Sequence, residues 1–255
     1  MSGIGKLYGL VGRRLGHSFS RDYFAKKFAA EGVNASYLNF EMESIGELMS
    51  LVDCYPTLCG VNVTIPYKQD VMALLAEVSD EARAIGAVNV VKIERDVEGV
   101  ARLTGYNSDW VGFTRSIEPL LRPMLASAPV EALVLGTGGA SHAVCYALRA
   151  MGVGVTLVSR KAGEGRLTYG DLTPEVMASH RVVVNTTPCG MSPDVTGCPE
   201  IPYECLTDRH LCYDLVYNPE VTEFMRRAAE RGATVKNGLE MLIGQAEEAW
   251  SIWNG

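Results

Sequence analysis

Several features are missing from this 255-residue chain, and each absence excludes a class of protein. There is no C-x-x-C motif, the count of seven cysteines is odd, and the four histidines do not pair with them at zinc-site spacing. We therefore expect no metal and reduced thiols, which fit a cytoplasmic protein. Positive charge is not in excess either, because the net charge is −7. This argues against general affinity for nucleic acid or anionic membranes.

Long apolar runs are also missing. The longest stretch without a charged residue, 132–148, is broken by Gly-Thr-Gly-Gly-Ala-Ser, so it does not predict a membrane span. Residues 1–16 lack the apolar core and the cleavage site of a signal peptide. What the chain does have is 47% hydrophobic and 21% charged residues, a composition typical of a globular protein with a substantial core.

Strand-like and helix-like segments alternate along the first part of the chain. This order predicts an α/β fold with a mainly parallel sheet and helices on its faces. We predict strands at 7–11, 37–42, 60–65 and 88–93, and helices at 20–30, 45–52 and 68–75.

A second helix-rich part begins near Asp109, and residues 122–131, with two prolines, suggest a connector. The loop 187–204 is long enough to predict a functional or mobile segment. Beyond the connector we predict strands at 132–135, 153–158, 182–184, 211–215 and 234–235, and helices at 140–151, 221–231 and 238–253.

A glycine-rich turn lies between a predicted strand and a predicted helix. Its residues are Gly136, Thr137, Gly138, Gly139, Ala140 and Ser141. In a dinucleotide fingerprint the first glycine allows the tight turn, the second lets the backbone approach a pyrophosphate, and the third small residue allows helix–strand packing. The helix N-terminus then faces the phosphates. An ordinary βα turn is the alternative interpretation.

The next strand ends in Ser159, Arg160 and Lys161, with no acidic residue that would bind the ribose 2′-hydroxyl of NAD. Arginine at this place suits the 2′-phosphate of NADP. Ordinary surface charge explains these two cations almost equally well from local sequence.

Lys68 follows a strand-like run that is stopped by Pro66, and it begins a predicted helix. An ammonium ion in a first helical turn faces the positive end of the helix dipole, which suits a catalytic lysine better than a structural one. Asp109 is a partner for it in proton transfer, although Asp109 alone also reads as a helix cap. Ser18 and Ser20 precede a helix and form a candidate carboxylate site, although capping alone would explain Ser20.

Eight segments together resemble the shikimate dehydrogenase family, in order and over the whole chain. They are residues 16–20, 62–68, 86–89, 105–109, 136–140, 185–191, 213–219 and 237–245.

The resemblance implies NADPH-dependent reduction of 3-dehydroshikimate to shikimate, a step towards chorismate and the aromatic amino acids. It implies that Lys68 and Asp109 form the catalytic pair and that Ser18 and Ser20 hold the substrate carboxylate. Thr64, Asn89, Asp109 and Gln245 would bind the ring hydroxyls, with Tyr217 close by. The implied NADP-binding residues are Gly136, Thr137, Gly138, Gly139, Ala140, Ser159, Arg160, Lys161, Thr186 and Gly238.

The same resemblance implies two domains and a monomer or homodimer. The substrate domain would comprise residues 1–108 plus 238–255, and a Rossmann-type NADP domain residues 109–237, with a cleft between them. The chain departs from the family pattern at Glu164, where a second arginine is usual and Arg166 is the nearest substitute. Alternatives are a paralogue acting on quinate or using NAD, a folate-linked dehydrogenase of similar build, and a nucleotide-binding regulator without activity.

Overall fold

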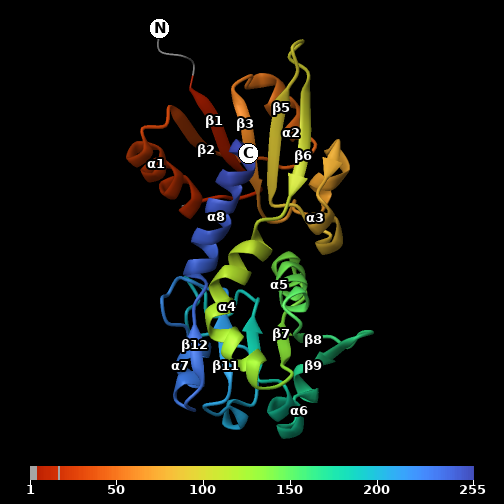
Figure 1. Ribbon diagram of the computed structural model, residues 1–255, viewed down its shortest axis with the longest axis vertical. Coiled ribbons are helices and arrows are strands. Elements are labelled where there is room, and N and C mark those ends of the chain that lie inside the picture. Colours follow the sequence, from red (N-terminus) through yellow and green to blue (C-terminus); the bar gives the residue numbers. More distant parts are fainter. Residues whose placement is uncertain (1–4, 17) are drawn as a thin grey trace. The chain divides into compact units, whose positions relative to one another are not determined.

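The computed structural model describes residues 5–16 and 18–255; His17, part of the 16–20 segment, lies outside them. The chain divides into two compact units, one formed by Met1–Ser108 with Ala246–Gly255 and the other by Asp109–Gln245. Figure 1 labels the elements of both.

The first unit contains a mixed six-stranded sheet in the order β2-β1-β3-β5-β6-β4. Strand β1 pairs in parallel with β2 and β3, whereas β5 pairs antiparallel with β3 and β6. The strands are β1 (Lys6–Gly12), β2 (Ala35–Glu41), β3 (Leu58–Val63), β4 (Glu77–Val78), β5 (Val90–Arg95) and β6 (Ala101–Tyr106).

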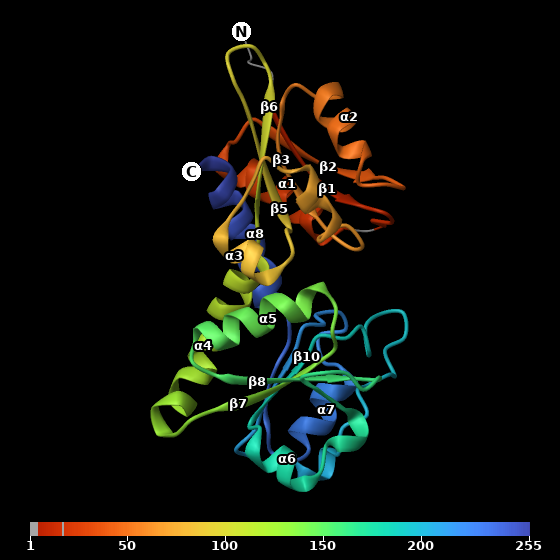
Figure 2. The same ribbon diagram turned by 90° about the vertical axis from the view of Figure 1, so that its right-hand side faces the viewer.

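Helices cover both faces of this sheet (Figures 1 and 2). On one face, α2 (Glu47–Cys54), α3 (Asp80–Ile85) and the 3-10 segment η1 (Asp70–Leu74) bury apolar side chains against the strands. On the other, α1 (Phe19–Glu31) packs with the end of α8 (Leu239–Asn254). This second core is aromatic: Trp253 is 4% exposed, stacks on Tyr8 and donates from Nε1 to the Val91 carbonyl at 3.1 Å.

The second unit contains a fully parallel sheet, ordered β12-β11-β10-β7-β8-β9. Its strands are β7 (Glu131–Leu135), β8 (Gly154–Ser159), β9 (Arg166–Thr168), β10 (Val182–Asn185), β11 (Leu211–Asp214) and β12 (Thr234–Lys236). Numbered from β7, this is the doubly wound strand order of dinucleotide-binding folds, and the direction of winding reverses between β7 and β10. The predicted α/β class with a Rossmann-type domain is confirmed.

Helices again lie on both faces (Figure 2). Strand residues point alternately to a core shared with α4 (Asp109–Ser127) and α5 (Gly139–Ala150), and to a core shared with α6 (Pro174–Ser179) and α7 (Glu223–Ala229). Two short 3-10 segments, η2 (Tyr169–Asp171) and η3 (Tyr203–Cys205), complete the described elements of this unit.

The predicted connector at 122–131 is wrong in its first half, because α4 continues to Ser127 through Pro119 and Pro123. Each proline removes one backbone hydrogen bond. Burial of Phe113, Ile117 and Leu121, all 0% exposed, on one face of the helix offsets that loss.

The predicted helix at 68–75 is also wrong. Residues 65–69 form turns, and a 3-10 segment begins only at Asp70. Tyr67 is 3% exposed and its hydroxyl donates to the Met42 carbonyl at 2.7 Å, so this buried ring anchors the turn. The helix-dipole argument for Lys68 therefore does not hold. Sequence periodicity also missed the short elements β4, α3, β6, β9 and α6.

Candidate active site

In the first unit, the carboxyl ends of the parallel strands β1 and β3 lie side by side. Thr64 follows β3, and its N–H donates to the Val11 carbonyl at 2.9 Å. A Cβ atom on Gly12 would lie 2.7 Å from the Thr64 methyl carbon, so the absence of a side chain there lets the two strand ends approach. Ligands of α/β sheets bind at such carboxyl ends.

Lys68 and Asn89 join the same group of loops. The Val88 N–H donates to the Lys68 carbonyl at 2.7 Å, and the Val63 N–H donates to the Asn89 carbonyl at 2.9 Å. The Asn89 side chain is 2% exposed and is bound to Ser108: its Oδ1 accepts from the Ser108 N–H at 2.7 Å and its Nδ2 lies 3.1 Å from Ser108 Oγ. Three candidate residues thus meet within one unit.

The structure exchanges the capping roles that the sequence suggested for Ser18 and Ser20. Ser18, not Ser20, is the N-cap of α1, and its Oγ accepts from the Arg21 N–H at 3.4 Å. Ser20 lies in the first turn of α1, beside Tyr37. Burial raises the pKa of Tyr37, and its hydroxyl donates to Asn62 Oδ1 at 2.8 Å.

In the second unit, the glycine-rich turn lies at the point where the sheet reverses its winding. Gly136 has φ +111°, a conformation that favours glycine, and its N–H donates to the Val158 carbonyl at 2.8 Å. A Cβ atom there would lie 2.8 Å from Thr186 Oγ1. Thr186 in turn donates from N and Oγ1 to the Leu135 carbonyl, at 3.0 and 2.6 Å. The ends of β7 and β10 are therefore joined around the turn.

The start of α5 suits a phosphate group. Gly138 is the N-cap and has no side chain to bond the first N–H groups of the helix. A Cβ atom on Gly138 would meet nothing within 4 Å, which leaves room for a ligand in front of these donors. Thr137 and Gly138 are exposed, and Gly139 and Ala140 are half-buried. Ser141 is buried and donates from Oγ to the Gly138 carbonyl at 2.6 Å.

Cations lie at the end of the neighbouring strand. Ser159 ends β8 with its Oγ donating to the Lys161 carbonyl, and the side chains of Arg160 and Lys161 are exposed. The Arg160 charge lies near Tyr169, where burial has the larger effect and raises the pKa of the hydroxyl. The glycine-rich turn, the N–H groups at the start of α5 and the two cations together form a set of donors that fits a phosphorylated dinucleotide.

In the second unit, the first turn of α4 approaches the part of α8 that contains Gln245. Asp109 begins α4 and is 6% exposed. One turn later, a Cβ atom on Gly112 would lie 2.7 Å from the Gln245 N atom, and one on Gly244 would lie 3.1 Å from the Gly112 Cα. Glycine at both positions lets the two helix backbones touch.

Comparison with known proteins identifies the family of this chain. Residues 10–91 match the family model described as the shikimate dehydrogenase substrate binding domain. The curated shikimate dehydrogenase (NADP(+)) of Aquifex aeolicus is 37% identical over 98% of this chain and 91% of its own length. The chain belongs to the shikimate dehydrogenase family. The predicted resemblance is thereby confirmed.

Solved structures agree with this family membership. A crystal structure of shikimate dehydrogenase from Aquifex aeolicus has a TM-score of 0.85 at 34% identity, covering 100% of this chain and 94% of that one. Quinate dehydrogenase from Corynebacterium glutamicum, in complex with NAD, has a TM-score of 0.84 at 29% identity and covers 98% of this chain and 94% of its own.

Other features bear on the site of this family member. Tyr217 follows β11 and is 38% exposed, and Gly238 precedes α8 with its N–H donating to the Val216 carbonyl at 3.2 Å.

Within residues 5–16 and 18–255, no three or more His, Cys, Asp or Glu side chains are grouped so as to hold a metal. In that same part of the chain, no helix is both long and apolar enough to cross a membrane.

The sequence interpretation missed a buried polar group formed by Asn185, Asp214 and Thr222. Asn185 and Asp214 stand in two of the eight family segments, so the signal was present. The contact between Asn185 and Asp214 could not be predicted from the sequence, because only the pairing of β10 with β11 in the sheet brings them together.

Proposed function

We propose that this protein catalyses the reversible, NADPH-dependent reduction of 3-dehydroshikimate to shikimate, in the pathway to chorismate and the aromatic amino acids. The observation that carries the proposal is the full-length similarity to an enzyme named shikimate dehydrogenase (NADP(+)), combined with a glycine turn at the switch point of a doubly wound sheet. When bound, NADPH would supply the hydride, and the residues of the chain supply binding and the proton.

Lys68 and Asp109 are the proposed acid–base pair. Reduction of a ketone leaves an alkoxide, so a proton must be delivered to that oxygen, and the reverse reaction needs a base at the same place. The Lys68 ammonium group would donate the proton, and the Asp109 carboxylate would be its partner in the proton transfer. Family similarity and the placement of Lys68 among the substrate-side loops support this assignment.

The remaining residues divide between substrate and cofactor, as the family pattern implies. Ser18 and Ser20 would bind the substrate carboxylate, and Thr64, Asn89, Tyr217 and Gln245 would surround the ring hydroxyls. For Ser18 and Asn89 this role would come in addition to their bonds to Arg21 and Ser108. NADP would contact Gly136, Thr137, Gly138, Gly139, Ala140, Ser159, Arg160, Lys161, Thr186 and Gly238.

We further propose that the substrate domain comprises residues 1–108 plus 238–255 and the NADP domain residues 109–237, with the cleft between them. The protein would act in the cytoplasm as a monomer or homodimer, without a nucleic-acid partner.

Activity on quinate, or use of NAD, is the second candidate. The structural similarity to a quinate dehydrogenase solved with NAD, with a TM-score of 0.84, supports this second candidate function. Rates with shikimate and quinate, each measured with NADP and NAD by nicotinamide absorbance, separate the two candidates. A protein that bound nucleotide but turned over neither acid would be a regulator instead.

The decisive experiment replaces Lys68. We expect purified Lys68→Ala to fold normally and to lose about 10²- to 10⁴-fold in kcat, the usual contribution of general acid–base catalysis. Gln69→Ala, in the same turn and exposed, is the matched control and should keep wild-type rates. A Lys68→Ala enzyme that reduced 3-dehydroshikimate at a near wild-type rate would refute the assigned role.

A further inference from the structure

The carboxylate of Asp214, which the proposed reaction does not use, is enclosed at the end of β11. Asp214 is 0% exposed and accepts hydrogen bonds from three separate segments. Its Oδ1 accepts from Asn185 Nδ2 at 2.9 Å and from the Val216 N–H at 3.0 Å, and its Oδ2 accepts from Thr222 Oγ1 at 2.6 Å. A carboxylate is suited to this place because it accepts from several donors at once.

The first segment held by Asp214 is the turn after β10. Asn185 donates to Asp214, while its own Oδ1 accepts from Thr187 N and Oγ1 at 3.0 and 2.6 Å. Thr187 and its neighbour Thr186 are the residues that a Cβ atom on Gly136 would meet, at 3.1 and 2.8 Å. The carboxylate therefore acts, through Asn185, on the residues that enclose the glycine-rich turn.

The second segment directly follows β11 and bonds to the residue that precedes α8. Val216 donates its N–H to Asp214 and accepts at its carbonyl from the Gly238 N–H at 3.2 Å. The fit at Gly238 is tight, because a Cβ atom there would lie 2.1 Å from the Leu215 carbonyl oxygen. Asp214 thus helps to fix the place where α8 begins.

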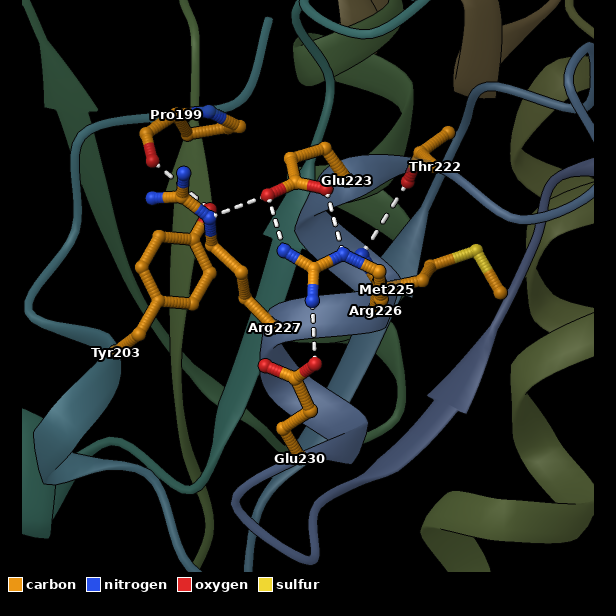
Figure 3. A network of polar contacts seen from close by, with 8 residues as sticks. All are labelled: Pro199, Tyr203, Thr222, Glu223, Met225, Arg226, Arg227 and Glu230. Atoms are coloured by element: carbon orange, nitrogen blue, oxygen red, sulfur yellow. Dashed lines mark hydrogen bonds and ion pairs between the residues drawn. The ribbon is translucent and has the colours of Figure 1, made fainter. Parts of the chain in front are cut away.

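The third segment is the start of α7. Thr222 is 1% exposed and is the N-cap of this helix, with its Oγ1 accepting from the Met225 N–H at 3.3 Å while donating to Asp214. Figure 3 shows Thr222 reaching Met225 beside an exposed network in which Glu223 binds both Arg226 and Arg227. One hydroxyl therefore links the helix start to the buried carboxylate.

We propose that Asp214 is a positioning residue for nucleotide binding, and that its carboxylate holds the turn after β10 and the segment before α8 in the geometry that NADP requires. This inference rests on the proposed cofactor site. Burying a carboxylate opposes its charge, so a neutral side chain would be favoured here if folding alone mattered. Groups that are costly for stability are commonly kept where function needs them.

The test compares three variants with the wild type. All measurements are made at pH 8 and at a temperature well below that at which each protein unfolds. Asp214→Asn removes the charge at constant shape, Thr222→Val removes the donor, and Thr222→Ser keeps it. We expect the first two to raise the Kd for NADPH, measured by nicotinamide fluorescence, and the KM for NADP by at least about tenfold, as for loss of a hydrogen bond to a charged group. Thr222→Ser should bind NADPH within about twofold of the wild type, since it keeps that bond.

Ser116→Ala is the control for a merely structural role. It removes the buried partner of the Tyr213 hydroxyl, 2.8 Å away, one residue before Asp214. It should lower the unfolding temperature and leave the Kd for NADPH unchanged. Wild-type NADPH affinity in folded Asp214→Asn or in Thr222→Val, or an equal loss in Ser116→Ala, would overturn the proposal.

The outcome also separates this inference from the proposed reaction. A wild-type protein that binds NADPH but does not turn over shikimate refutes the reaction, while the Kd values still decide the role of Asp214. A wild-type protein that does not bind NADPH overturns both.

Discussion

The stability of the protein should depend on pH through Asp214. Burial raises the pKa of this carboxyl to about 6, from a usual value of 3.8, although bonds from Thr222, Val216 and Asn185 pull the pKa down. Between these two pH values the folded protein holds a proton that the unfolded chain has lost. Stability from this group is therefore complete below about pH 4 and is lost as pH rises through about 6.

The size of the effect follows from the shift. A rise of about two pKa units corresponds to roughly 3 kcal/mol in the free energy of unfolding. Because Asp214 is 0% exposed, solvent screening does not reduce this figure by much. Carboxyls with a lowered pKa, such as Glu223 at about 2, contribute in the opposite direction and at lower pH.

The assay is denaturant unfolding of wild type and Asp214→Asn at several pH values from 4 to 7.5. Groups common to both proteins cancel in the difference, which leaves Asp214. We expect the stability of the wild type relative to the variant to fall by roughly 2.5 kcal/mol across this range. Parallel curves would show that the carboxyl titrates alike in the folded and unfolded chain, and would refute the reasoning.

Three further variants test the packing and the cofactor site. Gly238→Ala places a Cβ atom 2.1 Å from the Leu215 carbonyl oxygen, so we expect about 1–3 kcal/mol of destabilisation in thermal unfolding, and an unchanged Tm would contradict the tight fit. Trp253→Ala removes a buried ring and its bond to Val91, and should cost about 3–5 kcal/mol in urea unfolding; a loss below about 1 kcal/mol would mean that the C-terminal helix adds little to the first unit. Arg160→Ala should raise the KM for NADP about tenfold or more and leave the KM for NAD nearly unchanged, and equal effects on both nucleotides would rule out 2′-phosphate recognition.

Much of the fold could be predicted from local pattern. The strands at β1, β3 and β10 alternate or run apolar over short lengths, and the turn at Gly136 carries its own chemical requirement for glycine. Short elements such as β4 and β9 have too few residues for a period to appear, so sequence reasoning missed them. Sheet pairing, a long-range property, is what makes them strands.

The sequence by itself determined the family, the α/β class and the glycine-rich turn at Gly136, because these depend on residue types at fixed spacing. Only the tertiary structure decided the local states of α4 and of the turn at Lys68. Burial of Ile117 and Leu121 outweighs the helix-breaking effect of Pro119, and the buried ring of Tyr67 holds a turn where propensity favoured a helix. The group around Asp214 likewise exists only because parallel pairing brings the ends of β10 and β11 together, a contact between residues 29 positions apart.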